Sequence, residues 1–375
     1  MKKEVSSALP SGERPYNPNR FNGFDGALAF IIVLVAFIVV PSVVSALAGD
    51  VLRAIYEFDV YAYMCISIVL SQGIIFLTAF IYSKIRGVNP FDGGGYKISW
   101  DGVHVLMAIM LTVGIMMLFY YTHLQFSEFT EVLLPSGNQI EENFSPLSPI
   151  FVLVYLFEIS VFPAIVEEMM FRGIIMRGLE QFGSLFAVVC SAAMFALMHG
   201  NFGQLILQFI GGIAIGGVVM ITKNYLLGCI MHFINNSFAF IYTLLITPLV
   251  ENPVWRNITS VTGAASIALG VIFVLVSSIY FIAMLIEKEK AKALGKTMGN
   301  KYEKKRYYAI KEDGEERAVA HTEVPELMLS TENDQRLFLI NGRFKRINRR
   351  SKDVLSYVFI AIGITLSVVV ILLGL

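Results

Sequence analysis

Residues 149–173 read PIFVLVYLFEISVFPAIVEEMMFRG, a long apolar run that ends in two glutamates and an arginine. An apolar run of about 20 residues is long enough to cross the hydrocarbon core of a membrane as a helix. The whole chain has the same character, with a mean hydropathy of +0.66, 56% hydrophobic residues and only 15% charged residues. The sequence therefore predicts an all-α fold, a polytopic bundle of transmembrane helices.

Apolar segments predict eight or nine membrane spans, the uncertainty in number coming from the short segment 185–199. They lie near 27–48, 61–82, 103–121, 149–168, 185–199, 203–222, 225–247, 262–286 and 355–375. The corresponding organisation is an N-terminal tail (1–26), N-terminal helices (27–148), a helical core (149–247), an additional helix (248–286), a charged segment (287–354) and a C-terminal helix (355–375).

The distribution of charge predicts the orientation. The tail 1–26 and the segment 83–101 are basic, whereas 122–148 contains glutamates but no Lys or Arg. Short basic loops remain on the cytoplasmic side, so we expect a multi-pass protein of the cell membrane with a cytoplasmic N-terminus. The segment 287–354 is then cytoplasmic, and its excess of Lys and Arg would attract anionic lipid. Within it, 337–343 (LFLINGR) resembles half of a β-hairpin. The net charge of +0 gives no argument for a nucleic-acid partner.

Two adjacent acids at the end of the opening run are the first candidate for chemistry. Charged side chains at membrane depth cost free energy to retain and therefore indicate function. Glu168 and Arg172 are four residues apart and share a helix face, which predicts an ion pair. Glu167 is rotated from Arg172 by about 140° and is expected to be free to face a cavity, where it could act as a general base. Glu158 is expected on the opposite face, as a polar anchor outside the site.

Two histidines in separate apolar segments are the second candidate. Phe195 and His199 are one helical turn apart, as are His232 and Asn236. A lone histidine in an apolar helix is usually a packing residue, but two such histidines near an acid pair indicate a site. Glycines at 200 and 203 break the helix after His199, and irregular backbone at membrane depth indicates a water-filled cavity.

These residue types suggest hydrolysis by water, because no serine or cysteine accompanies them as a nucleophile. Glu167 would take the proton of the water and His199 would help to hold it. His232 and Asn236 would donate to the carbonyl oxygen that gains negative charge. The sequence thus predicts a membrane-embedded hydrolase, and a peptidase in particular.

The segments PAIVEEMMFRG (163–173), FALMH (195–199) and HFINN (232–236) resemble the motifs EExxxR, FxxxH and HxxxN of the CPBP family. That family comprises CAAX prenyl proteases and bacteriocin-processing or immunity proteins. The resemblance covers residues 149–247, about a quarter of the chain. It implies an all-helical intramembrane peptidase that acts on a membrane-associated peptide or protein. It also implies that the first glutamate, Glu167, is the base, with Glu168, Arg172 and Phe195 in support.

A zinc site is the main alternative within this chemistry. Glu167, Glu168, His199 and His232 are residue types that bind zinc. The HExxH spacing is absent, however, and an arginine already neutralises one acid, so we expect no cofactor. The three cysteines lie far apart in apolar segments and predict neither a disulfide framework nor a metal site.

Two non-hydrolytic classes are also compatible with acids in a membrane. A bacteriocin-immunity or scaffold protein could retain the fold without turnover, but all the motif residues are intact here. A proton-coupled transporter could use the acids as a relay, but the sequence has no evident internal repeat of the kind common in such proteins. The identity of the substrate and any requirement for prenylation stay open.

Overall fold

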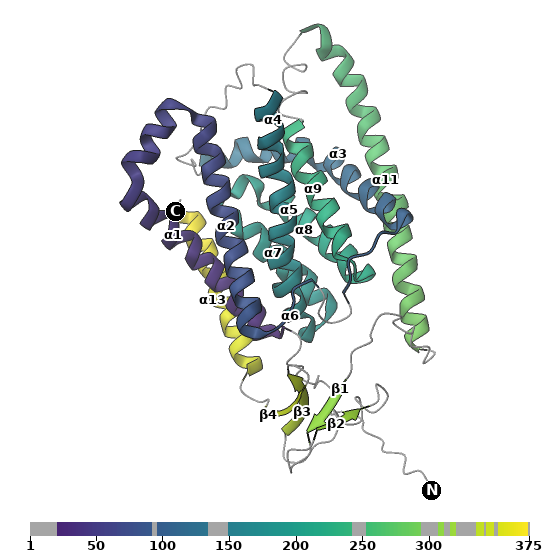
Figure 1. The fold of residues 1–375 in the computed structure, drawn as a ribbon. Coiled ribbons are helices and arrows are strands. Elements are labelled where there is room, and N and C mark those ends of the chain that lie inside the picture. Colours follow the sequence, from purple (N-terminus) through teal and green to yellow (C-terminus); the bar gives the residue numbers. More distant parts are fainter. Residues whose placement is uncertain are drawn as a thin grey trace.

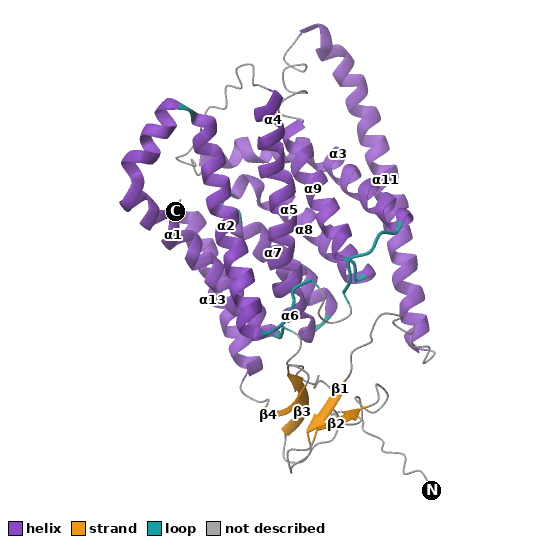
Figure 2. Ribbon diagram, in the orientation of Figure 1, coloured by secondary structure: helices purple, strands orange, loops and turns teal. Residues whose placement is uncertain are grey.

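The computed structural model describes residues 21–91, 96–133, 149–241, 253–293 and 352–373, together with four short strands at 307–310, 316–319, 335–340 and 343–348 (Figure 1). The long described segments form a bundle of helices. Figure 2 shows the strands gathered at one end of this bundle, the end at which α6 lies. The predicted all-α membrane bundle is confirmed for the helical part of the chain.

The helices follow the predicted apolar segments. They are α1 (Gly23–Phe58), α2 (Val60–Arg86), α3 (Gly102–Leu133), α4 (Pro149–Leu156), α5 (Phe162–Met170), α6 (Arg177–Leu179), α7 (Ser184–Met198), α8 (Phe202–Thr222), α9 (Tyr225–Ile241), α11 (Pro253–Ala293) and α13 (Lys352–Leu373). Two π-helical turns, η1 (Phe157–Val161) and η2 (Phe171–Met176), join α4, α5 and α6, and a 3₁₀ turn, η3 (Glu180–Phe182), follows. The junctions keep right-handed helical backbone, so 149–182 is one continuous helix, here called the motif helix.

Six described helices are long and apolar enough to cross a membrane. They lie at Gly23–Phe58, Val60–Arg86, Gly102–Phe119, Phe202–Thr222, Ala265–Lys290 and Val354–Leu372. The three other predicted spans correspond to the motif helix, to the shorter apolar helix α7 and to α9. The chain is a multi-pass membrane protein.

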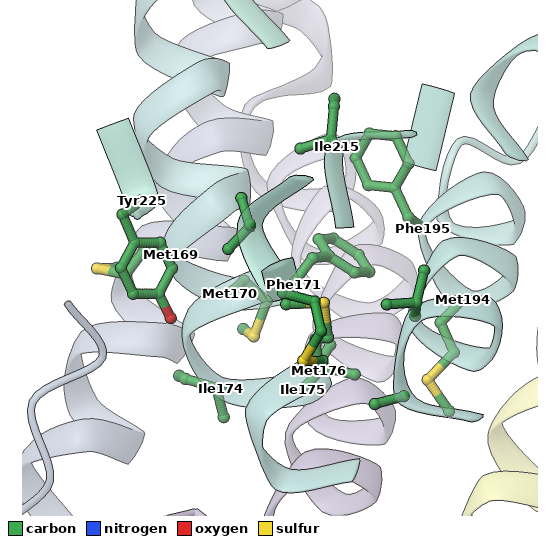
Figure 3. Close-up of a cluster of buried hydrophobic side chains, with 14 of the residues drawn as sticks. Met169, Met170, Phe171, Ile174, Ile175, Met176, Met194, Phe195, Ile215 and Tyr225 are labelled. Atoms are coloured by element: carbon green, nitrogen blue, oxygen red, sulfur yellow. The ribbon is translucent and has the colours of Figure 1, made fainter. Parts of the chain in front are cut away.

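The motif helix lies in the middle of the bundle. Every residue from Val166 to Leu179 is buried, and Figure 3 shows several of these side chains packed together with Met194 and Phe195 of α7, Ile215 of α8 and Tyr225 of α9. The acids and the arginine of the opening sequence therefore lie on the most enclosed helix of the structure.

Glycines allow α1 to approach the motif helix closely. A Cβ atom on Gly178 would lie 2.4 Å from the backbone oxygen of Asn22, and one on Gly26 would lie 2.8 Å from that of Ile175. The same end of α1 is fixed by a capping box between Asn22 and Asp25. Arg86 of α2 donates two hydrogen bonds to Asp25, at 2.7 and 3.0 Å. Helix α1 therefore packs directly against residues 175–178 of the motif helix, and α2 is joined to α1 through Asp25.

This contact leads to a stability prediction. Gly178→Ala should destabilise the protein by about 1–3 kcal/mol, because the new methyl group can be accommodated only if backbone moves. Gly217→Ala on α8 is the matched control, since its Cβ would meet nothing within 4 Å. The control should be neutral or slightly stabilising, as alanine favours helix over glycine by about 1 kcal/mol. Thermal unfolding in detergent measures both, and equal midpoints for the two variants would contradict the close approach of α1.

The charged segment 287–354 contains two β-hairpins. β1 (Tyr307–Ile310) pairs antiparallel with β2 (Glu316–Val319), and β3 (Gln335–Ile340) pairs antiparallel with β4 (Arg343–Asn348). The second pair confirms the hairpin predicted at 337–343. Helix α11 continues to Ala293 and α13 begins at Lys352, so both enter the predicted charged segment. Most of the predicted tail 1–26 and of the acidic segment 122–148 lies outside the described residues.

Candidate active site

The EExxxR motif spans α5 and the π turn η2. The Nη1 atom of Arg172 lies 2.7 Å from Oε1 of Glu168, and both side chains are almost fully buried, at 1% and 0% exposed. The predicted ion pair is therefore present. Its burial makes it different from a surface pair, because neither charge has water as an alternative partner.

This ion pair connects all three motifs. His232 of α9 places Nδ1 2.9 Å from Glu168 Oε1. Arg172 donates from Nη2 to the carbonyl oxygen of Gly212 on α8 at 3.1 Å, and its guanidinium lies 4.9 Å from the ring centroid of Phe195 on α7. Glu168 thus orients the imidazole of His232, and Arg172 holds Glu168.

Glu167 is also buried, at 8% exposed, and lies beside His232. Its Oε2 atom is 3.7 Å from Nε2 of His232. Its Oε1 atom accepts a hydrogen bond of 2.8 Å from Nε2 of Gln72 on α2. As expected, Arg172 pairs with Glu168 and not with Glu167, but Gln72 holds one of the two oxygens of Glu167, a contact that was not predicted. A glutamine within an otherwise apolar span was the only sequence signal for this contact.

The aromatic ring of Phe195 connects the two histidines. It makes edge-on contacts with His199 at 4.8 Å and with His232 at 5.6 Å between centroids. Nδ1 of His199 lies 2.8 Å from the carbonyl oxygen of Phe195. A carbonyl can only accept, so Nδ1 carries a proton and Nε2 of the neutral ring is left as an acceptor. Gly200 follows at a positive φ of 66°, which confirms the predicted end of the helix.

Asn236 lies one turn further along α9 and contacts a different element. Its Nδ2 atom donates to the carbonyl oxygen of Ile159 in η1 at 2.9 Å, and its Oδ1 atom accepts from Asn235 at 3.2 Å. The structure therefore brings six of the seven predicted residues into one connected cluster and ties Asn236 to the neighbouring π turn. The six are Glu167, Glu168, Arg172, Phe195, His199 and His232.

A family model described as "Type II CAAX prenyl endopeptidase Rce1-like" matches residues 149–238, the segment that contains all seven predicted residues. The chain carries an Rce1-like domain. The match confirms the resemblance to CAAX proteases and shows a domain of a protease family. No curated protein and no solved structure matches the chain.

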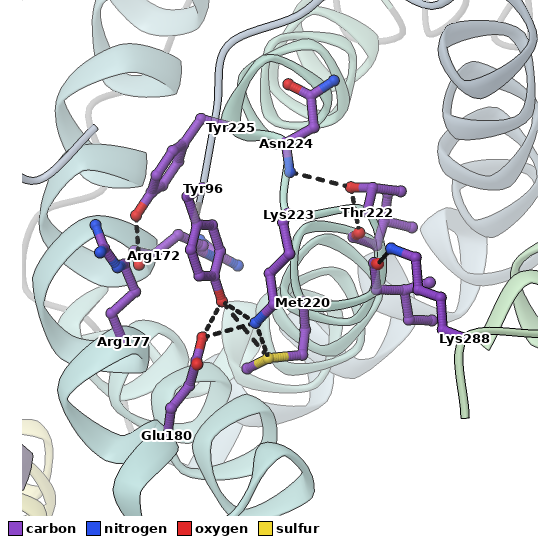
Figure 4. Close-up of polar contacts among 12 residues, drawn as sticks. Tyr96, Arg172, Arg177, Glu180, Met220, Thr222, Lys223, Asn224, Tyr225 and Lys288 are labelled. Atoms are coloured by element: carbon purple, nitrogen blue, oxygen red, sulfur yellow. Dashed lines mark hydrogen bonds and ion pairs between the residues drawn. The ribbon is translucent and has the colours of Figure 1, made fainter. Parts of the chain in front are cut away.

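Polar contacts at Arg172 in η2 and at Glu180 in η3 join the motif helix to α9 and to the segment before α3 (Figure 4). The hydroxyl of Tyr225 donates to the carbonyl oxygen of Arg172 at 2.9 Å. Tyr96 donates to the carboxylate of Glu180, which also accepts from Lys223 at 3.1 Å. Burial, and next the charge of Glu180, raise the pKa of Tyr96 well above its usual value, so the phenol keeps the proton that it donates. The segment before α3 is thereby fixed against the motif helix.

An apolar cavity of about 410 Å³ lies between the motif helix and α9 of the Rce1-like domain. Its lining is Phe91, Ile98, Val161, Ala164, Ile165, Tyr225, Leu226, Cys229, Ile230 and Phe233. Neither glutamate of the motif nor either histidine lines it. The predicted water-filled cavity is therefore not this one.

Proposed function

We propose that the protein is an intramembrane endopeptidase that hydrolyses a peptide bond with a water molecule activated by Glu167. One observation carries the proposal: within an Rce1-like domain, a buried carboxylate lies 3.7 Å from an imidazole nitrogen of His232. A carboxylate held beside an imidazole in a water-poor environment is placed to accept the proton that an attacking water releases, which is the role of a general base.

The hydrogen bonds around Glu167 support a division of roles. Gln72 engages Oε1 of Glu167, so Oε2 is the oxygen that would receive the proton of the water. His199 has Nε2 available as an acceptor, because its Nδ1 is bonded to the carbonyl of Phe195. This nitrogen would accept the second hydrogen of the water and orient one of its lone pairs toward the substrate.

Asn236 and the imidazolium form of His232 would stabilise the negative charge that develops on the carbonyl oxygen of the substrate. The imidazolium is required because the Nδ1–H of His232 is bonded to Glu168, and only the doubly protonated ring carries a second N–H, on Nε2, that can donate. Glu168 and Arg172 hold the ring of His232, and a preorganised donor costs little reorganisation during the reaction. The amide of Asn236 has two N–H groups, of which one is bonded to Ile159. The second would donate to the same oxygen.

This mechanism requires no metal, and the donor set argues against zinc. Oε1 of Glu168 accepts from Arg172 and faces His232, so two of the four candidate ligands already engage each other. In the part of the chain that the structure describes, no three His, Cys, Asp or Glu side chains are placed to hold a metal ion. We therefore propose hydrolysis without a cofactor.

The proposed partners follow from the membrane location. The substrate would be a membrane-associated peptide or protein, and no nucleic acid is involved. The name of the matching family makes prenylated CAAX peptides the first class to test, followed by bacteriocin precursors. With a cytoplasmic N-terminus in the cell membrane, the basic segment 287–354 would lie on the inner side and bind anionic lipid.

The proposal is tested by a cleavage assay with purified full-length protein in detergent. A library of membrane-associated peptides, with and without C-terminal prenylation, should yield defined endoproteolytic products. The rate should stay the same when a strong zinc chelator is added. Loss of cleavage on chelation and recovery with zinc would support the zinc alternative. Folded protein that cleaves no peptide in the library would support the non-catalytic alternative.

A further inference from the structure

A third acid lies on the same side of the motif helix as Glu167. Glu158 belongs to η1, which contacts α2, and its carboxylate is close enough to the thiol of Cys65 on α2 to interact with it electrostatically. Glu167 accepts a hydrogen bond from Gln72, which lies on α2 as Cys65 does. Cys65 and Gln72 are seven residues apart, almost two full turns, and so share one face of α2. Both acids therefore point toward this face.

The expectation that Glu158 lies on the opposite face is wrong, and the π turn explains why. An α-helix rotates by about 100° per residue, which would place a side chain nine residues before Glu167 on the far side. The turn Phe157–Val161 takes more residues per revolution than an α-helix. It therefore shifts the direction of Glu158 toward α2.

Several buried polar atoms near these acids have no hydrogen-bond partner in the described part of the chain. They are Oε2 of Glu158, Oγ of Ser160, Oε1 of Gln72 and Oγ of Ser237. Ser160 is completely buried. The atoms belong to three elements that meet, since α2 contacts Glu158 through Cys65 and α9 is bonded to η1 through Asn236.

Such atoms point to a ligand that is itself polar and small. Buried polar atoms in folded proteins nearly always have a partner, and where protein supplies none the partner is ordered water. A buried water binds two to four polar groups, and these elements offer at least four. The rise from Cys65 to Gln72 along α2 is roughly 10 Å, which about three or four hydrogen-bonded waters would span.

We propose that Glu158, Ser160 and Gln72 bind a file of buried water molecules that leads from Cys65 to Glu167 and supplies the water for hydrolysis. This inference rests on the proposed function for its role but not for its existence. Glu158 is a positioning residue here, because it orients water and does not touch the reacting bond.

The chain contains a matched pair of probes for this water. Cys65 lies at the start of the proposed file, a few residues inside α2, and Cys229 lines the apolar cavity a few residues inside α9. Both thiols are half-buried. Two single-cysteine variants of the full-length protein, Cys190→Ala with Cys229→Ala and Cys65→Ala with Cys190→Ala, would be placed in lipid nanodiscs. Each would be treated with a small cationic methanethiosulfonate, which reacts in water and not in hydrocarbon.

Cys65 should react at least roughly tenfold faster than Cys229, since only Cys65 would be in contact with water in the folded protein. An apolar maleimide should label both and so shows that each thiol can be reached. A Cys65 rate equal to or below that of Cys229 would overturn the proposed water file, whatever the protein cleaves.

The supply role has a separate readout. Ser160→Ala removes the hydroxyl without adding bulk to this fully buried position and should lower kcat roughly tenfold without changing KM, as expected when a water loses its hydrogen-bond partner. Ser83→Ala is the control, because Ser83 is a buried hydroxyl without a described partner near the other end of α2. Equal kcat values for the two variants would overturn the supply role. If the wild-type protein cleaves no peptide, the proposed function fails while the labelling ratio still decides whether the file exists.

Discussion

Glu167→Gln should abolish turnover while leaving the fold and substrate binding in place. The glutamine keeps an oxygen that can accept from Gln72, whose bond to Glu167 measures 2.8 Å, and it keeps the volume of the side chain. It cannot take a proton from water. General-base catalysis contributes about 10²–10⁴-fold, so we expect kcat to fall by roughly a thousandfold. Peptide cleavage measures kcat, and binding of the uncleaved peptide is measured on the same sample.

The control for this substitution is an exposed glutamate on another helix. Glu57→Gln changes a side chain that is 64% exposed and paired only with Arg53 among the described ion pairs, so activity and stability should both stay at wild-type values. Retained turnover in Glu167→Gln would place the base elsewhere. A lowered unfolding temperature together with lost binding would mean that Glu167 has a structural role instead.

Arg172→Leu should have the largest effect on stability, about 3–5 kcal/mol, since it leaves the carboxylate of Glu168 buried without its cation. Glu168 is 0% exposed and Arg172 is 1% exposed, so water cannot replace the missing partner. The substitution also removes the bond to Gly212 and the contact with Phe195. The change is measured as the midpoint of thermal unfolding in detergent, with the loss of the monodisperse size-exclusion peak as the readout.

A double variant separates the buried charge from the packing. Glu168→Gln combined with Arg172→Leu removes both charges, while the amide oxygen can still accept from His232. The double variant should therefore be more stable than Arg172→Leu alone. If the stability losses of Glu168→Gln alone and Arg172→Leu alone add up to the loss of the double variant, the ion pair does not account for the effect of Arg172→Leu. The lost packing against Phe195 then accounts for it.

Local helix geometry was enough to predict part of the site from the sequence. The Glu168–Arg172 pair follows from a spacing of four residues, and the pairing of Phe195 with His199 follows from one helical turn. The contacts of Gln72 with Glu167 and of Asn236 with Ile159 join elements that are far apart in the sequence, and no periodicity encodes them. The meeting of the three motifs was indicated by their residue types and agreed with the resemblance, but the contacts that join them were not predicted.

The π turns mark the limit of the helical-wheel argument. The sequence FEISV at 157–161 has the composition of an ordinary apolar α-helix, so it did not indicate that the segment forms a π turn. The direction of Glu158 was therefore predicted wrongly, although its presence was noted. The charged composition of 287–354 did not indicate strands. Only the segment 337–343 predicted a hairpin, and the structure has a second strand pair, β1 with β2.

The bond from Gln72 to Glu167 makes α2 part of the proposed catalytic site. The matched segment 149–238 contains every motif residue but not this donor, which comes from a helix that precedes it in the chain. An isolated fragment of residues 149–238 would contain all three motifs but would lack the hydrogen bond from Gln72 to Glu167, the proposed base. A fragment that keeps this contact must include α2, and grafting the signatures onto another scaffold would require an amide donor to Glu167 from a neighbouring helix.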